Sequence, residues 1–554
     1  MTPAILVLSA GGLATAASIA SALADAETLG LKGRVGGDVD RGFDDMTATV
    51  RELFQAGRPI IGLCAAGILI RMIAPLLGAK RQEPPVLAVS EDGRVVVPLI
   101  GGLTGGNELA GAIASALGTT AAITGSGARA FGVILERPPQ GWTCANPDDA
   151  KRVTADLLAG AQARVEGELP WLADTAIPVA DRGDVLLRAS VHVEAPPVRG
   201  LLYRPRCVVA AVTAGRTDLA GVMSEAGIDA AALAAVVLPA DGSTPPPRRM
   251  EAPVRVLDGV FASAGALALA AAGEGARLMH EADGAALAAA RSPVDPNGIG
   301  RPRGRVAVVG LGPGTEAWRT PEATAEIEAA SDIVGYAPYI AQLPERVRAR
   351  ARCHSSDNRV EIERARLALD LAAAGMRVAV VSSGDPGIFA MAAALMEALE
   401  ETRPGWASVE IAVLPGISAM QAAAARVGAP LGHDFAAISL SDNLKPWSVI
   451  ERRLKAALSA DLVLALYNPV SRARPGRLAE TMAEVARHRP ADTPIVLGSD
   501  VGRSGERVRV VALADFTADM ADSRTVVLVG SSRTRRFVFG SQAFVYTPRH
   551  YADG

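Results

Sequence analysis

The sequence predicts a multidomain α/β protein, with α/β domains in the N-terminal half and a further α/β domain at the C-terminus. The chain has 554 residues, more than one hydrophobic core usually organises. Short apolar runs alternate with Ala-rich helical stretches in both halves, which is typical of sheets covered by helices. Apolar residues make up 49% and charged residues 21% of the chain, as in globular proteins.

The first region, 1–132, begins with an apolar run, a glycine turn and an Ala-rich stretch, which predict a strand and a helix. A second helix is expected at 107–117, where small and apolar residues recur at helical spacing. The expected strands of this region are 4–9, 59–63, 86–89, 95–100 and 121–124.

The middle of the chain is less regular. Residues 133–200 are rich in Pro, Asp and Trp, and we expect a poorly packed connecting region. Region 201–292 opens with a strand at 207–213 and continues with helices at 229–236 and 262–271. Between these helices, DGSTPPPRR at 241–249 predicts an exposed loop.

A Pro-, Gly- and Arg-rich break at 291–304 indicates an interdomain linker, which we place at 293–304. Residues 305–554 then alternate again and predict a complete α/β domain. Its expected strands are 305–310, 332–334, 378–382, 409–414, 436–440, 462–467, 495–499 and 525–530, and its expected helices are 321–330, 360–374, one from near 389 and one from 418.

Composition excludes several classes of function. A formal net charge of -3 gives no support for nucleic-acid binding. The four cysteines are scattered without a C-x-x-C pair, and the six histidines form no ligand motif, so no metal site is expected. The apolar N-terminus has no basic residue before Lys32, which argues against a signal peptide. No apolar run reaches the ~18 residues needed to span a bilayer, so we expect a cytoplasmic protein without a membrane partner.

Three glycine-bearing turns of the last domain each follow an expected strand. They are VGLGPG at 309–314, SSGDPGIF at 382–389 and LPGISA at 414–419. Ligands of open α/β sheets collect at the carboxyl ends of strands, and glycine lets a ligand approach the backbone closely. The first turn is not the G-x-G-x-x-G dinucleotide fingerprint, and Pro313 removes an amide donor, which disfavours an NAD oxidoreductase.

These turns, in this order, resemble the tetrapyrrole (corrin and porphyrin) methylase family, from residue 305 to about 551. Further segments resemble its precorrin-3B C17-methyltransferases: VGYAPY at 334–339, GAPLGHDFAAISL at 428–440, SDNLKPW at 441–447, LYNPVSR at 466–472 and DVGRSGE at 500–506. The resemblance implies a two-lobed domain that methylates a corrin-precursor tetrapyrrole in cobalamin biosynthesis. Another tetrapyrrole methylase activity, such as that of the uroporphyrinogen enzyme, is the alternative.

The family resemblance also implies S-adenosyl-L-methionine as the methyl donor. Matching positions give the cofactor-binding residues Pro313, Ser383, Gly384, Asp385, Ile388, Ser418, Ala419, Asn468 and Gly502. For Asp385 a second interpretation stands beside this one, an N-terminal cap of the helix that begins near Phe389.

The resemblance also implies that the macrocycle contracts during the reaction. Methyl transfer depends mostly on alignment, whereas ring contraction calls for an acid or base. His433 and Asp442 are the catalytic candidates, and a buried structural histidine and a helix-capping aspartate are the competing interpretations. Arginine suits the carboxylates of the substrate. Two or three of the following are expected at the site: Arg452, Arg453, Arg472, Arg474, Arg503, Arg533, Arg535 and Arg536.

Residues 1–132 and 201–292 resemble the CbiG family, whose members open the lactone of cobalt-precorrin-5A. The resemblance rests on GLCAAGILIRMIAPLL at 62–77, GGLTGGNELA at 101–110 and FASAGALALAAAGEGARLM at 261–279. Leu103-Thr104 stand where the resemblance leads us to expect a histidine, and Thr124 to Ala128 stand where it leads us to expect a Thr-Thr-Ala-Thr-Asp-like strand end. The loop before Asn107 is suited to a carboxylate, and Glu108 is either an acid-base group or a complement to the positive helix end.

Three functions remain open for this half: a hydrolase, a corrinoid-binding module, or a structural partner of the methyltransferase. The sequence does not distinguish a cobalt-loaded from a metal-free substrate. We expect a homodimer.

Overall fold

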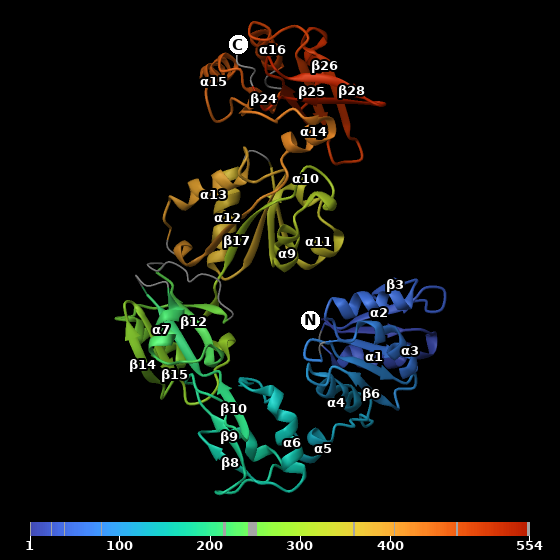
Figure 1. The fold of residues 1–554 in the computed structure, drawn as a ribbon, viewed down its shortest axis with the longest axis vertical. Helices are drawn as coiled ribbons and strands as arrows, with labels where there is room; N and C mark the ends of the chain where they lie inside the picture. The colour runs from blue at the N-terminus through green and yellow to red at the C-terminus, as the bar shows by residue number, and fades with distance from the viewer. Residues whose placement is uncertain are drawn as a thin grey trace. The chain divides into compact units, whose positions relative to one another are not determined.

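The computed structural model describes residues 2–550 apart from 24, 38, 79, 214–217, 242–251, 358–359, 404 and 472–474 (Figure 1). The chain divides into two compact units. One consists of Met1–Val208, Met223–Ala234 and Arg291–Val294, and the other of Val209–Val222, Ala235–Ala290 and Asp295–Gly554. Most of the loop expected at 241–249 lies outside the described residues.

The first unit opens with a sheet in the order β3-β2-β1-β4-β5-β6, parallel except for β6. Its strands are β1 (Ala4–Val7), β2 (Glu27–Leu31), β3 (Arg41–Phe43), β4 (Ile60–Leu63), β5 (Val86–Val89) and β6 (Val96–Ile100). Strand side chains alternate between faces, so Ile5 packs with α1 (Leu13–Ala22) and α4 (Gly106–Ala116). Leu6 packs on the opposite face with α2 (Met46–Gln55) and α3 (Ala66–Ile73).

The strand expected at 121–124 does not form. Ala121 makes a single parallel bridge to Val96, and the amide of Ala122 donates to the carbonyl of Val96 at 2.8 Å. The amide of Ile123 then turns back to the carbonyl of Ala121, which ends the pairing after one residue.

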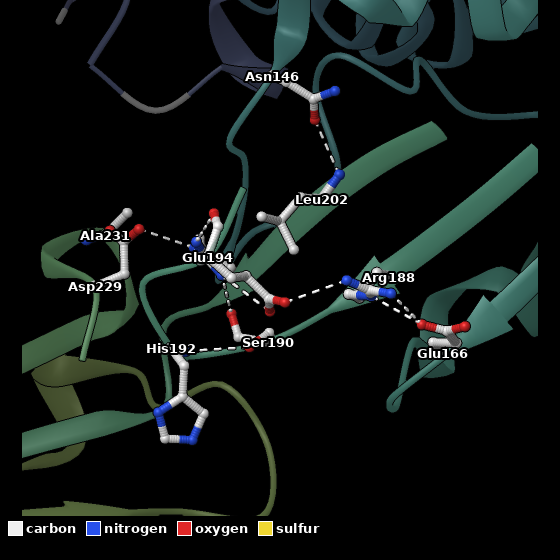
Figure 2. Close-up of polar contacts among 10 residues, drawn as sticks. Asn146, Glu166, Arg188, Ser190, His192, Glu194, Leu202, Asp229 and Ala231 are labelled. Carbon is white, nitrogen blue, oxygen red and sulfur yellow. Dashed lines mark hydrogen bonds and ion pairs between the residues drawn. The ribbon is translucent and has the colours of Figure 1, made fainter. Parts of the chain in front are cut away.

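The expectation of poor packing at 133–200 is wrong, because this stretch contributes to a sheet with its own core, in the order β7-β10-β9-β8. Its elements are β7 (Trp142–Cys144), α6 (Ala150–Leu158), β8 (Ala163–Glu166), β9 (Val185–Ala189) and β10 (Gly200–Pro205). Tyr203 is fully buried against Trp171 and donates its hydroxyl to the carbonyl of Leu135. Arg188 of β9 bridges Glu166 and Glu194 on its outer side (Figure 2). The aromatic core and these ion pairs hold the stretch together, although its sequence shows no clear helical or strand periodicity.

A mixed sheet follows in the order β14-β15-β11-β12-β13-β16, and most of it belongs to the second unit. Its strands are β11 (Val208–Val212), β12 (Leu233–Pro239), β13 (Val254–Leu257), β14 (Arg277–Ala282), β15 (Ala285–Ala289) and β16 (Arg301–Pro302), with α7 (Leu219–Glu225) and α8 (Ala264–Ala272). The helix expected at 229–236 is wrong. Asp229 caps one 3-10 turn, Ala230–Ala232, and the apolar residues after it form the central strand β12, buried on both faces. A fully apolar run of this length fits a buried strand and a helix equally well.

The break at 291–304 is structured and not a free linker. Arg255 of β13 is buried and donates to the carbonyls of Ile299 at 2.7 Å and Gly300 at 3.0 Å. Burial lowers the pKa of Arg255. Strand β16 then pairs antiparallel with β13, so this segment forms the edge of a sheet. The boundary at 293–304 stays a prediction.

The next sheet is parallel throughout, in the order β19-β18-β20-β17-β21. Its strands are β17 (Arg305–Gly310), β18 (Asp332–Tyr336), β19 (Arg352–Ser356), β20 (Arg377–Ser382) and β21 (Glu410–Leu414). Helices α12 (Glu361–Ala373) and α13 (Met391–Leu399) cover one face, and α9 (Pro321–Ala329) and α11 (Glu345–Arg350) cover the other (Figure 1). The short α10 (Ala337–Ile340) follows β18. We call this part the first lobe.

The second lobe contains a mixed sheet in the order β23-β24-β27-β25-β26 and a small sheet in the order β22-β29-β28. Its strands are β22 (Gly428–Ala429), β23 (Phe435–Ser439), β24 (Val463–Tyr467), β25 (Pro494–Ser499), β26 (Arg507–Ala512), β27 (Thr525–Val529), β28 (Arg535–Phe539) and β29 (Gln542–Tyr546). Helices α15 (Trp447–Ser459) and α16 (Arg477–Val485) pack on one face of the larger sheet, and α14 (Ala419–Val427) packs on the other.

Candidate active site

The three glycine turns of the first lobe meet at the carboxyl ends of β17, β20 and β21. Gly312 and Gly384 form an antiparallel bridge, in which the amide of Gly384 donates to the carbonyl of Gly312 at 2.8 Å. A Cβ on Gly416 would lie 2.2 Å from the carbonyl oxygen of Gly384, and one on Gly310 would lie 2.7 Å from the amide nitrogen of Gly416. The turns therefore touch backbone to backbone, and a side chain at either of these positions would push them apart.

Asp385 joins the second turn to the third. Its carboxylate accepts the amide of Gly387 at 2.8 Å within its own turn and the amide of Gly416 at 3.0 Å in the other. The N-terminal cap of α13 is Ala390, so Asp385 is not the cap of that helix. Its contacts hold the shape of the site.

The third turn leads into α14 through a capping box. Ser418 is buried and caps the helix at the amide of Gln421, whose side chain returns to the amide of Ser418. The hydroxyl of Tyr467, at the end of β24, accepts the amide of Met420 at 3.1 Å. Burial raises the pKa of Tyr467, so its hydroxyl stays protonated.

The second lobe reaches the first through the turn that contains Gly502. A Cβ on Gly314 would lie 1.9 Å from the carbonyl oxygen of Gly502, and that carbonyl accepts the amide of Thr315 at 3.0 Å. Arg503 donates to the carbonyl of Pro313 at 3.0 Å and lies 3.5 Å from the hydroxyl of Ser383. One arginine of the second lobe thus contacts two turns of the first.

Glu506 holds this interlobe turn from the other side. It accepts the amide of Gly502 at 2.8 Å and pairs with Arg426 of α14 at 3.1 Å. The hydrogen bond from Arg426, together with that amide, holds the pKa of Glu506 below its ordinary value of 4.5. The guanidinium of Arg426 also lies over the ring of Trp318 at 4.8 Å.

The structure brings most of the sequence-predicted cofactor residues together. Ile388 and Ala419 pack against one apolar cluster of the second lobe, beside Trp318 and Tyr467. Asn468 takes a left-handed backbone conformation, with φ of 52°, and donates to the hydroxyl of Ser439 at 3.0 Å. Gly312, Gly384 and Gly502 each have a positive φ, a backbone conformation that glycine adopts more readily than other residues.

The two catalytic candidates lie at opposite ends of β23. His433 precedes the strand and accepts the amide of Asp434 on Nδ1 at 2.8 Å. Asp442 follows the strand and lies 3.9 Å from Nε of Arg477. Because β23 and β24 are parallel, Asp442 shares the edge of the sheet where Asn468 lies, and His433 does not.

The arginine candidates are dispersed. Arg503 contacts two of the glycine turns, Arg452 and Arg453 lie on α15, and Arg535 and Arg536 are exposed on β28. Arg472 and Arg474 lie outside the described residues. Sequence reasoning missed Tyr467, Trp318 and Glu506 as parts of the site. Tyr467 had a usable signal, since it stands directly before Asn468 in the LYNP motif.

In the N-terminal unit, the glycine-rich loop at 101–106 turns tightly into α4. Gly101 has a φ of 78°, and its Cβ would lie 2.5 Å from Cα of Pro85. Glu108 pairs with Arg137 at 2.9 Å in the first turn of α4. Two adjoining clefts of about 630 and 900 Å³ share Arg137 and the residues after it as a wall, and Asn107 lines the larger one.

No group of three His, Cys, Asp or Glu side chains among the described residues is arranged to hold a metal ion. The described helices are all too short or too polar to cross a bilayer.

Two family models match the chain. Residues 305–517 match the tetrapyrrole (corrin/porphyrin) methylases, and residues 48–127 match the model described as cobalamin synthesis G N-terminal. A precorrin-3B C(17)-methyltransferase of Sinorhizobium sp is 49% identical over 253 residues, which are 45% of this chain and 98% of that protein. A probable cobalt-factor III C(17)-methyltransferase of Salmonella typhimurium is 39% identical, over 44% of this chain and 99% of the other. The solved structure of the methyltransferase CobJ is 51% identical over 44% of this chain and all of that one, with a TM-score of 0.42.

The chain belongs to the tetrapyrrole methylase family, through its C-terminal part, and is a methyltransferase of that family. It is a homologue of the precorrin-3B C17-methyltransferases that also carries a CbiG N-terminal domain. The methyl donor of the family is S-adenosylmethionine.

Proposed function

We propose that residues 305–554 methylate C17 of precorrin-3B, or of its cobalt form, with contraction of the ring in cobalamin biosynthesis. The observation that carries the proposal is the meeting of the three glycine turns of the first lobe, which the second lobe joins through the contact of Gly502 with Gly314 and through Arg503. The relatives from Sinorhizobium and Salmonella, named for precorrin-3B and for cobalt-factor III, support the position of methylation and leave the metal open.

The residues around Gly384 fit S-adenosylmethionine. Gly384 is left-handed, and a Cβ on it would be in van der Waals contact with Cα of Ser418 at 3.8 Å, so the second turn faces the start of α14 at close range. We assign the backbone of the Ser383, Gly384 and Asp385 segment to the methionine end, with the polar groups on either side of Gly384 as its partners, because the amide of Gly384 already donates to Gly312. Ser418, Ala419, Ile388 and Asn468 would hold the adenosine, with Pro313 and Gly502 closing the site.

S-adenosylmethionine supplies an electrophilic methyl group on a sulfonium, and the chain's own task is alignment. Arg503 serves it by fixing Pro313 and Ser383 relative to the second lobe. For ring contraction we assign proton transfer to Asp442, because it shares the edge of β23 and β24 with Asn468. His433, at the other end of β23, stays a weaker candidate.

Purified protein incubated with labelled S-adenosylmethionine and a panel of metal-free and cobalt-loaded precorrins tests the proposal. Mass analysis should find one methyl group added at C17 of a precorrin-3B-type substrate. Asp442→Asn should uncouple methylation from contraction, whereas His433→Gln should leave both unchanged. Preferential methylation of uroporphyrinogen III would contradict the assignment.

For the N-terminal half we propose a corrinoid-binding module. The two clefts beside Asn107 and Arg137 offer apolar walls together with amide and guanidinium donors, which suit a ring with acid arms. Glu108, the acid-base candidate, is already paired with Arg137, which favours binding over hydrolysis.

A ring-contracted precorrin added to the full chain should show a shifted visible spectrum. The part of this shift that remains in Asp385→Ala is assigned to the N-terminal half, and Asn107→Leu should weaken that part. Acetaldehyde released at a catalytic rate would instead establish a hydrolase. No change between the variants would leave the half structural. We further propose a cytoplasmic homodimer, which sedimentation at several concentrations tests for its oligomeric state.

A further inference from the structure

Phe389 has an unusual conformation for a large apolar residue. It ends the second turn, SSGDPGIF, in a left-handed backbone conformation with φ of 54°. Its side chain is 49% exposed. Left-handed backbone is unfavourable for a residue with a Cβ, and an exposed aromatic ring gains little from burial. The fold nevertheless holds this ring where the second glycine turn leads into α13.

Two residues of the second lobe hold the ring of Phe389. Tyr467 packs edge to face against it, with ring centroids 5.4 Å apart. The ammonium nitrogen of Lys445 lies 5.7 Å from the centroid of the same ring, within the range of a cation–π contact. Since the hydroxyl of Tyr467 also binds the amide of Met420 at the start of α14, this group adjoins the cofactor turns directly.

The charge on Lys445 has no carboxylate partner in the part of the chain that the structure describes. No carboxylate among the described residues lies within ion-pair distance of its ammonium group, and the neighbouring charge that acts on it is Arg453. Burial, and then Arg453, lower the pKa of Lys445. The adjoining Leu444 is 91% exposed. A half-buried cation beside a second cation and an apolar surface is complementary to an anion attached to an apolar body.

We propose that Phe389 and Lys445 form the platform that selects the tetrapyrrole substrate. The ring of Phe389 receives the flat apolar face of the macrocycle, and the ammonium of Lys445 pairs with one peripheral carboxylate. The inference rests on the proposed function and adds to it the residues that position the acceptor. It predicts that Lys445 governs recognition of the acceptor and takes no part in binding of the methyl donor.

The test is steady-state kinetics of the full chain with precorrin-3B, combined with calorimetry of S-adenosylmethionine binding. Lys445→Met should raise KM for the tetrapyrrole roughly tenfold, the effect of losing one charged hydrogen bond, with kcat and donor affinity unchanged. Lys445→Arg should restore most of the loss. Phe389→Leu should raise KM without altering its dependence on salt. The matched control is Lys455→Met on α15, where the lysine pairs with Glu451 on the surface.

A partly esterified precorrin provides the decisive comparison. If Lys445 pairs with a carboxylate, masking that carboxylate should bring the wild-type KM to the level of Lys445→Met. Equal KM values for wild type and Lys445→Met on the free acid would overturn the platform. So would a loss of donor affinity in Lys445→Met that matches its loss of activity. If the wild type methylates no precorrin, the proposed function itself fails, which is a separate result.

Discussion

The carboxylate of Asp385 accepts the amide of Gly416 at 3.0 Å, across 31 positions of sequence. The same carboxylate accepts the amide of Gly387, so one side chain fixes the distance between two turns of the site. An ionised acceptor makes such bonds stronger than a neutral one does. Asp385 therefore acts on the site through its neighbours' amides.

Replacement of Asp385 by Ala should weaken S-adenosylmethionine binding roughly 10- to 100-fold, because two amides lose a charged acceptor. Calorimetric titration of the donor measures the effect. Asp92→Ala is the matched control, since Asp92 makes the same kind of local turn contacts, to Ser90 and Arg94, in the N-terminal unit. An unchanged dissociation constant in Asp385→Ala would remove this turn from the donor site.

Gly416→Ala should abolish donor binding and destabilise the first lobe by roughly 1–3 kcal/mol, because its Cβ would lie 2.2 Å from the carbonyl oxygen of Gly384. Gly111→Ala in α4 meets nothing within 4 Å and should stabilise the chain by up to about 1 kcal/mol. Thermal unfolding monitored for both variants separates a steric effect from a general effect of adding a methyl group. Normal donor binding by Gly416→Ala would mean that the turns are looser than their contacts indicate.

The contacts by which Glu506 holds the turn of Gly502 should depend on pH. Its pKa is lower in the folded protein than in the unfolded chain, so its contribution to stability is complete above about 4.5 and is lost as the pH falls through the lowered value. Glu506→Gln should be less stable than wild type at neutral pH, and the difference should shrink in acid. Denaturant unfolding from neutral pH to pH 3 measures it, with the exposed Glu397→Gln as control. A difference that does not vary with pH would assign the effect of Glu506 to packing.

A fragment that begins at Arg303 should bind S-adenosylmethionine like the full chain. Gly304 accepts the amide of Glu410, and Arg303 donates to the carbonyl of Ser408, so both belong to the first lobe. Calorimetry on the folded fragment tests the boundary proposed at 293–304. In the full chain, Arg255→Met should expose the segment 291–302, which precedes the first lobe, to trypsin. Three carbonyls at 297–300 lose their donor in this variant. A folded fragment without affinity for the donor would place part of the site before Arg303.

Local signals predicted much of the fold. Ser418 and Gln421 form the capping box that their spacing indicates, and the strands before the three glycine turns appear where the apolar runs predict them. The helix predicted at 229–236 was wrong because both faces of β12 are buried. The residues of such a strand are all apolar, so the sequence does not show the alternation that identifies a strand. The core around Tyr203 and Trp171 was missed because it depends on aromatic packing and on no periodic pattern.

The geometry of the candidate site was predictable where the backbone needs a particular residue type, above all glycine. Gly384 and Gly502 have positive φ angles, and the motifs that contain them were identified from the sequence. The contact of Asp385 with Gly416 and that of Arg503 with Pro313 join turns that are distant in sequence, so no local pattern encodes them. The sequence motif identifies Asp385 as a candidate, but only the structure shows that its partner is the amide of Gly416.

The backbone contact among Gly310, Gly384 and Gly416 bears on how such a chain can evolve. Peptide groups are common to every residue, so a contact made by them withstands most single substitutions and fails where one of these glycines changes. The side chains of Phe389 and Lys445 do not take part in that contact and can be exchanged one at a time. With Phe389 and Lys445 as the acceptor platform proposed above, a methyltransferase built in this way would acquire a new acceptor by mutation there while the glycine turns are inherited unaltered.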